Sequence, residues 1–132
     1  MQVIKTNLEE ERMETKIGKF EDLKVWQEGL ELSIEIYKIF KENKDFSFRD
    51  QVQRSSVSIP SNIAEGYERQ TNKEFIQFLY IAKGSCGELR TQLYIAKKLQ
   101  MINKTTSEIL IEKTKKISAM LYKLIQTRRQ KF

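Results

Sequence analysis

The chain has 132 residues, a formal net charge of +6, one cysteine and no histidine. This composition excludes a disulfide framework, a zinc site, a histidine-assisted nucleophile and the Glu-x-x-His pairs of di-iron bundles. No apolar run approaches the ~20 residues of a transmembrane helix, and the N-terminus lacks a signal-peptide pattern, so we expect a cytoplasmic protein without a membrane partner.

Residues 1–19 are polar and carry four basic and four acidic groups without a sustained apolar face. We therefore predict a mobile N-terminal arm over residues 1–19 and one folded domain over residues 20–132. Five glycines and one proline leave room for few turns, and the apolar residues follow a helical period throughout. An all-α domain is expected.

The first helix is predicted over residues 22–43, with Asp22 as its N-cap. Two adjacent apolar stripes run along it, where one would suffice for the core of a small bundle. The second stripe favours burial between subunits, and Trp26 is interpreted as a core residue. The stripes are Leu23, Trp26, Leu30, Ser33, Tyr37 and Phe40, and beside them Val25, Gly29, Leu32, Ile36 and Ile39.

The second helix is predicted over residues 48–68, capped by Ser47, and it contains Pro60. A proline inside a helix removes one backbone hydrogen bond and clashes with the preceding turn. Four serines surround Pro60, and their hydroxyls can satisfy freed carbonyls, so we predict a kinked but continuous helix. Asn62 is expected to bond to nearby backbone, and Gly66 to relieve left-handed strain near the helix end.

The third helix is predicted over residues 72–101, after a capping box that Thr71 and Glu74 form. Its middle contains Gly84 and Gly87, whose cost in a helix should be offset by close packing against the small residues of the second helix. Cys86 lies on the apolar seam and is read as a buried small hydrophobe. The seam residues are Phe75, Leu79, Ala82, Cys86, Leu89, Leu93 and Ala96.

The fourth helix is predicted over residues 106–127, after a second capping box at residues 105–108. Residues 104–132 carry eight basic and two acidic groups, so the whole excess charge lies in this last segment. Such a run is either a solvated helix face or the footprint of an acidic partner such as nucleic acid, and the sequence leaves both open. The candidate contacts are Lys115, Lys116 and Lys123 on the helix and Arg128, Arg129 and Lys131 beyond its end.

Three blocks of the chain resemble those of the four-helix-bundle proteins encoded in 23S rRNA intervening sequences. They are FEDLKVWQ at residues 20–27, RSSVSIPSNIAEG at residues 54–66 and FLYIAKGSCGEL at residues 78–89. The blocks contain the structural motif residues Pro60, Asn62, Glu65, Gly66, Gly84 and Gly87. The family is more distantly similar to the accessory protein of diversity-generating retroelements, a basic pentamer that works with a reverse transcriptase.

The helical pattern and the family resemblance indicate the same architecture. Short polar links near Lys44, Gln70 and Lys104 predict an antiparallel up-down-up-down four-helix bundle. The apolar double stripe favours a closed homo-oligomer, and the resemblance implies that it is a pentamer. The resemblance implies no settled activity.

Three functions remain open. The first is a non-catalytic oligomeric scaffold that binds nucleic acid, with RNA preferred, through the basic fourth helix. The second is a protein-protein adaptor for a nucleic-acid-processing enzyme such as a reverse transcriptase. The third is an enzyme that uses carboxylates, with Glu65 and Glu88 as the polar candidates. We expect no catalytic residue, no metal and no cofactor.

Overall fold

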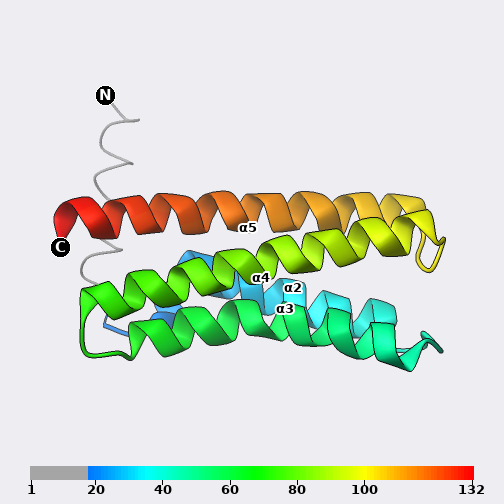
Figure 1. Ribbon diagram of the computed structural model, residues 1–132, viewed down its shortest axis with the longest axis horizontal. Helices are drawn as coiled ribbons and strands as arrows, with labels where there is room; N and C mark the ends of the chain where they lie inside the picture. The colour runs from blue at the N-terminus through cyan, green and yellow to red at the C-terminus, as the bar shows by residue number, and fades with distance from the viewer. Residues whose placement is uncertain (1–17) are drawn as a thin grey trace.

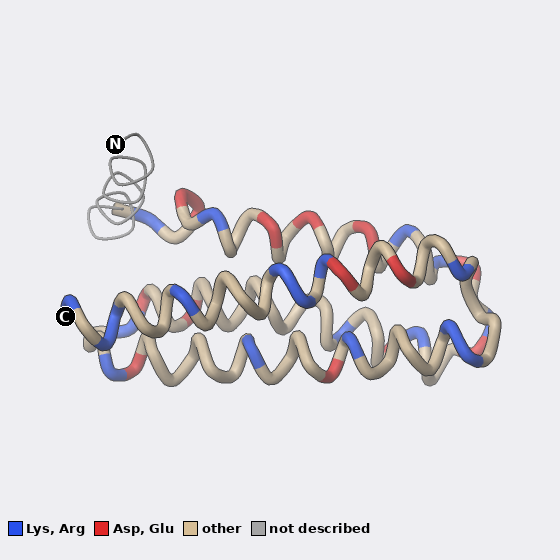
Figure 2. The backbone as a smooth tube through the Cα atoms, turned by 90° about the horizontal axis from the view of Figure 1, so that it is seen from above, with Lys and Arg blue, Asp and Glu red and all other residues tan. Residues whose placement is uncertain are grey.

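The computed structural model of the protein describes residues 18–132. These residues form a short 3-10 helix, η1 (Phe20–Asp22), and four α-helices: α2 (Lys24–Phe40), α3 (Phe46–Tyr67), α4 (Asn72–Lys98) and α5 (Lys104–Lys131). The α-helices lie along one long axis (Figure 1 and Figure 2), and residues 18–132 contain no β-strand. The all-α prediction is therefore confirmed. The arm predicted over residues 1–19 lies outside the described residues, except for its last two.

Side chains cap three of the four α-helices. Thr71 Oγ1 accepts a hydrogen bond from the backbone N–H of Glu74 and donates to Glu74 Oε1. Thr71 therefore caps α4 as predicted, and Glu74 bonds to the Thr71 hydroxyl. Asp45 Oδ1 accepts from the N–H of Phe48 at the start of α3. Asn103 Oδ1 accepts from two backbone N–H groups at the start of α5.

The other predicted caps are wrong, and at α3 and α5 the reason is that a preceding residue caps the free N–H groups instead. Asp45 and Asn103 precede the predicted caps Ser47 and residues 105–108, so α3 and α5 begin earlier than expected. Asp22 belongs to η1, and α2 starts after Leu23 without a side-chain cap.

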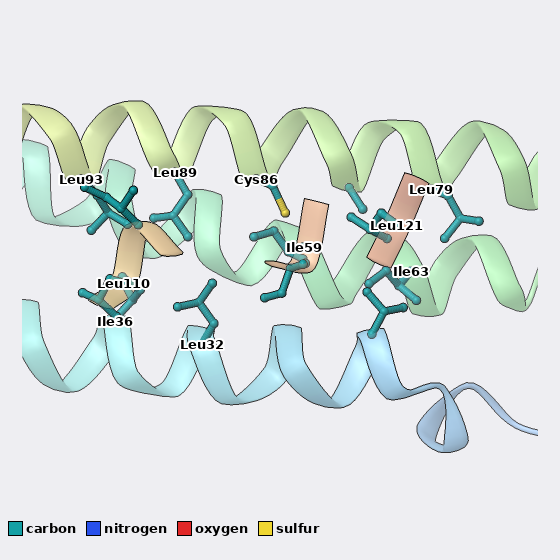
Figure 3. Packing of buried hydrophobic residues seen from close by; sticks show 14 of the residues in the cluster. Leu32, Ile36, Ile59, Ile63, Leu79, Cys86, Leu89, Leu93, Leu110 and Leu121 are labelled. Carbon is teal, nitrogen blue, oxygen red and sulfur yellow. The ribbon is translucent and has the colours of Figure 1, made fainter. Parts of the chain in front are cut away.

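The core lies along the centre of the bundle (Figure 3). All seven predicted seam residues of α4 are buried, as are Val52, Ile59 and Ile63 of α3. Each fully buried aliphatic side chain stabilises the fold by about 1.5–3 kcal/mol relative to an exposed one. The helical period therefore identified the inner face of α4 correctly.

Residues of both predicted stripes of α2 are buried in the single chain, among them Leu23, Ser33 and Phe40 of the first stripe. The second stripe faces the core, with Leu32 and Ile36 fully buried. Trp26 is partly buried against this core, and the ring of Phe20 packs edge-on against it, which confirms its reading as a packing residue. The α2 outer edge consists of the exposed apolar residues Leu30, Ile34 and Tyr37, which are 39%, 46% and 45% exposed in the single chain. Leu30 and Tyr37 belong to the first stripe, and Ile34 belongs to neither.

Helix α3 continues through Pro60, which lies buried inside it. The nearby serines do not all act as predicted. Ser55 and Ser56 donate to the carbonyls of Val52 and Gln53, which lie one turn before those that a proline frees. Asn62 Nδ2 donates to the Ser58 carbonyl at 2.7 Å, so the predicted hydrogen bond between Asn62 and nearby backbone is confirmed.

Two glycines bring α3 close to its neighbours. A Cβ atom on Gly66 would lie 2.5 Å from Phe78 Cβ of α4, so this position has no room for a side chain. Gly66 has no positive φ, and the prediction that it relieves left-handed strain is wrong. A Cβ atom on Gly29 of α2 would lie 3.2 Å from Ile59 Cγ2 of α3.

The packing predicted for Gly84 and Gly87 is also wrong. A Cβ atom on either glycine would meet nothing within 4 Å, so both positions face open space. The small residues of the two helices meet instead through serine, since the Oγ atoms of Ser58 and Ser85 share a hydrogen bond of 2.8 Å.

Contacts at both ends of the bundle join α4 to α5. Asn72 Nδ2, at the start of α4, donates to the carbonyl of Arg128 near the end of α5. Lys97, near the end of α4, pairs with Glu108 near the start of α5 at 3.3 Å. These contacts therefore join the two helices at both ends.

The glycines provide a matched pair of substitutions. Gly66→Ala should lower the free energy of unfolding by about 1–3 kcal/mol, because the new methyl group overlaps Phe78. Gly84→Ala should raise it by up to ~1 kcal/mol, because alanine favours the helix and the space is open. Urea unfolding followed by circular dichroism measures both. Equal effects of the two substitutions would contradict this account of the α3–α4 contact.

Candidate nucleic-acid interface

The predicted basic residues of α5 lie on more than one face of the helix. Lys116 Nζ donates to Glu28 Oε1 of α2 at 3.2 Å, and Lys113 Nζ donates to Glu35 Oε1 at 2.6 Å. Figure 2 shows acidic residues along α2 beside the basic residues of α5. Exposed pairs of this kind contribute ~0.2–1 kcal/mol each, so they orient the side chains without fixing them. Lys116 is thus directed toward α2.

The end of α5 is helical, which corrects the prediction that its last basic residues follow the helix. The Arg128 guanidinium lies over the rings of Phe75 and Phe132, 4.9 and 4.1 Å from their centroids. Arg129 lies over the ring of Tyr80 at 5.3 Å. Cation–π contacts therefore hold this end of α5 against the start of α4. Lys131 is exposed on the last helical turn.

A groove of about 340 Å³ lies between α4 and α5. Three of its six lining residues are cations, and none is acidic. Lys115 is the only predicted contact residue that lines it, and Lys123 lies on the neighbouring exposed face of α5. The lining residues are Lys83, Arg90, Lys115, Ser118, Ala119 and Tyr122.

The cations of the groove differ in how they are held. Arg90 Nε donates to Thr114 Oγ1 at 3.0 Å and Arg90 Nη2 donates to the Thr114 carbonyl at 3.3 Å, so α5 positions this guanidinium. Lys115 pairs with Glu112 on its own helix at 3.3 Å, and both side chains are exposed. Among residues 18–132, Lys83 has no ion-pair partner.

The two α4 residues that line the groove, Lys83 and Arg90, belong to a longer stripe of residues at alternating spacings of three and four. On a helix this spacing places the side chains in one row. The row contains two tyrosines and three cations, and the tyrosines are about two-fifths exposed. We call it the α4 basic edge; its residues are Tyr80, Lys83, Gly87, Arg90, Tyr94 and Lys97.

The sequence reasoning missed Lys83 and Arg90. The sequence did contain a sign of their position, because Lys83 directly follows Ala82 and Arg90 directly follows Leu89, both residues of the apolar seam. On a packed helix such positions flank the seam and border the neighbouring helix. Only the contact between α4 and α5 shows that this neighbour is the basic helix.

The two carboxylates considered for catalysis do not meet. Glu65 of α3 pairs with Arg69 at 2.8 Å on the exposed surface. Gly66 packs against Phe78, and Glu88 lies ten residues farther along α4, which is about 15 Å at the rise of an α-helix. This separation does not place Glu65 and Glu88 in one site. Within residues 18–132 no group of three or more acidic or cysteine residues is placed to hold a metal ion.

The structure shows no helix in residues 18–132 that is long and apolar enough to cross a membrane.

Cys86 is fully buried on the seam of α4, as predicted. Burial raises the pKa of its thiol to about 12, although the charges of Arg90 and Lys83 lower it in part. The thiolate is the reactive form, so a buried thiol with a raised pKa is inert at neutral pH. Cys86 is a packing residue.

Comparison with known proteins gives a family and a structural relative. Residues 21–123 match the family of 23S rRNA-intervening sequence proteins. A crystal structure of a protein with unknown function from the S23 ribosomal protein family of Bacteroides thetaiotaomicron VPI-5482 is similar, with 28% sequence identity and a TM-score of 0.72. The match covers 76% of this chain and 97% of that chain. No curated protein matches the chain.

The reactivity of Cys86 can be measured directly. A pKa near 12 lowers the thiolate fraction at pH 8 roughly a thousandfold relative to a thiol of pKa 9.0, so maleimide should label the folded protein slowly. Labelling in denaturing urea at the same pH should be fast and provides the control. Fast labelling of the folded protein would mean that the bundle opens around Cys86.

Proposed function

Because this chain belongs to the family of 23S rRNA-intervening sequence proteins, we propose that it is a non-catalytic oligomeric scaffold that binds nucleic acid, with RNA preferred. The observation that carries the proposal is the basic surface formed by the outer face of α5 and the groove beside α4. Lys115, Lys123 and Arg129 lie on this surface, and Lys83 and Arg90 extend it onto α4.

Charge is the main attraction in this proposal. Phosphate contacts by lysine and arginine release counterions from nucleic acid and supply most of sequence-independent binding. The net charge of +6 comes from residues 104–132, so α5 provides the field that attracts the ligand. No base-reading helix motif accompanies it, so the proposed binding follows backbone charge and not a specific sequence.

The proposal includes an antiparallel up-down-up-down bundle. Contacts between the helix ends support this arrangement. The start of α4 meets the end of α5 through Asn72 and Arg128, and the end of α4 meets the start of α5 through Lys97 and Glu108. Gly66, near the end of α3, lies against Phe78 in the first turns of α4.

The proposal also includes a closed homo-oligomer. The α2 outer edge leaves Leu30, Ile34 and Tyr37 partly exposed in one row, and aligned apolar side chains of this kind mark contact surfaces. The number of five subunits is taken from the family resemblance. A closed ring repeats the basic surface, so several weak phosphate contacts add to useful avidity.

Binding is tested by titrating structured RNA and duplex DNA across a salt series. We expect log K to fall with log salt by about 0.7–0.9 for each phosphate contacted. Lys115→Glu with Lys123→Glu should weaken binding to both ligands and reduce this slope by about 1 for each phosphate that the variant no longer binds.

The matched control is Lys38→Glu with Lys41→Glu, which changes the net charge equally on exposed positions of α2 and its C-cap. If both pairs of substitutions have the same effect, the α5 surface is not the binding site. If no ligand binds at low salt, the nucleic-acid proposal fails and the adaptor function becomes the better one.

The oligomer is tested by light scattering at micromolar concentration. We expect a mass several times that of the 15.7 kDa chain, and about five times if the family resemblance holds. Ile34→Glu should dissociate the assembly, because it places a charge in the α2 contact. Ile109→Glu, at a similarly exposed residue of α5, should not. A stable wild-type monomer would refute the oligomer, and a ring of another size would refute only the number.

A further inference from the structure

We infer that the groove between α4 and α5 binds single-stranded nucleic acid, with a base stacked on Tyr122 and phosphates on Lys83, Arg90 and Lys115. This inference rests on the proposed function. It restricts the ligand from nucleic acid in general to single strands. Charge alone attracts any nucleic acid, whereas a groove that combines cations with exposed aromatic rings favours strands whose bases are unpaired.

The charge of the groove fits a phosphate backbone. Arg90 is held in place by two hydrogen bonds to Thr114, which leaves further guanidinium N–H groups for a ligand. Lys115 is paired only with Glu112 on the solvent side, and such an exposed pair is weak enough to yield to a phosphate. No acidic residue lines the groove to repel an anion.

The aromatic ring in the groove is available for stacking. Tyr122 lines the groove and is 54% exposed, so one part of its ring packs on the protein and the rest faces solvent. Stacking tolerates every base, because each base has a π face. A tyrosine beside three cations therefore binds base and backbone of the same strand.

The stripe on α4 continues these contacts beyond the groove. Tyr80 lies one turn beyond Lys83; the Arg129 guanidinium of α5 lies over one face of its ring, and the residue is still 41% exposed. Tyr94 lies one turn beyond Arg90 in the other direction. The two tyrosines stand about 21 Å apart along the helix axis. That length corresponds to roughly six stacked nucleotides at about 3.4 Å each.

A duplex fits this surface less well. Its bases are stacked on each other and paired, so their faces cannot reach a ring between two helices. The duplex keeps its phosphate contacts with the lysines and arginines, and its binding follows charge alone. The structure therefore predicts a preference for single strands that depends on Tyr122 and is separate from the salt dependence.

The experiment uses fluorescence anisotropy to compare the affinities of three oligonucleotides of roughly twelve nucleotides: a uridine strand, a deoxythymidine strand and a duplex. The uridine and deoxythymidine strands show whether the groove distinguishes RNA from DNA. The full-length protein is used as wild type, Tyr122→Leu and Tyr122→Phe. Phenylalanine keeps the aromatic ring, whereas leucine keeps only apolar bulk.

We expect both single strands to bind more tightly than the duplex. Tyr122→Leu should lose roughly 5- to 100-fold in affinity for single strands while duplex affinity and the salt slope stay unchanged. Tyr122→Phe should bind as the wild type does. Unchanged urea midpoints of both variants show that the bundle is intact.

Two failures are distinguishable. If Tyr122→Leu binds single strands as tightly as Tyr122→Phe does, while the charge reversal on α5 still weakens binding, the stacking inference is overturned and the proposed function survives. If no oligonucleotide binds at low salt, the inference and the proposed function are both overturned.

Discussion

The close approach of α3 to its two neighbours is the constraint on which the bundle depends. On one side Gly29 of α2 lies against Ile59 and Pro60, and on the other Gly66 lies against Phe78 of α4. Neither position has free space for a larger side chain, because the packed interior cannot yield without displacing other residues. The two glycines thus set how close α2 and α4 lie to α3, and the remaining faces of those helices follow from this placement.

Polar contacts inside the bundle add a second constraint, on register. The one Ser55 hydroxyl proton is shared between the Val52 carbonyl, at 3.1 Å, and Gln92 Oε1 of α4, at 2.6 Å. The Oγ atoms of Ser33 and Ser56 share a hydrogen bond of 3.3 Å between α2 and α3. A buried polar group without a partner costs about 1–3 kcal/mol, so sliding either helix by one turn is unfavourable. Apolar seams alone tolerate such a shift more easily.

These constraints determine which cations form the basic surface. The contact between α3 and α4 turns the opposite side of α4 toward α5, so that Lys83 and Arg90 border the groove. On its other side, α5 faces the glutamates of α2, which pair with Lys113 and Lys116. One helix therefore supplies cations in two directions: toward α2, where they pair with glutamates, and toward the groove beside α4.

The sequence by itself determined the helices, the seam of α4 and the burial of Cys86, because helical periodicity is a local property of the chain. It also located the excess charge in residues 104–132. Helix ends were less predictable, since Asp45 and Asn103 each had a competing cap within a few residues. The tertiary structure alone decided that Gly66 packs closely while Gly84 and Gly87 face outward, because composition does not specify which helix a small residue meets. It alone joined Lys83 and Arg90 of α4 to Lys115 and Tyr122 of α5, because residues far apart in the chain share a groove only through the packing of their helices.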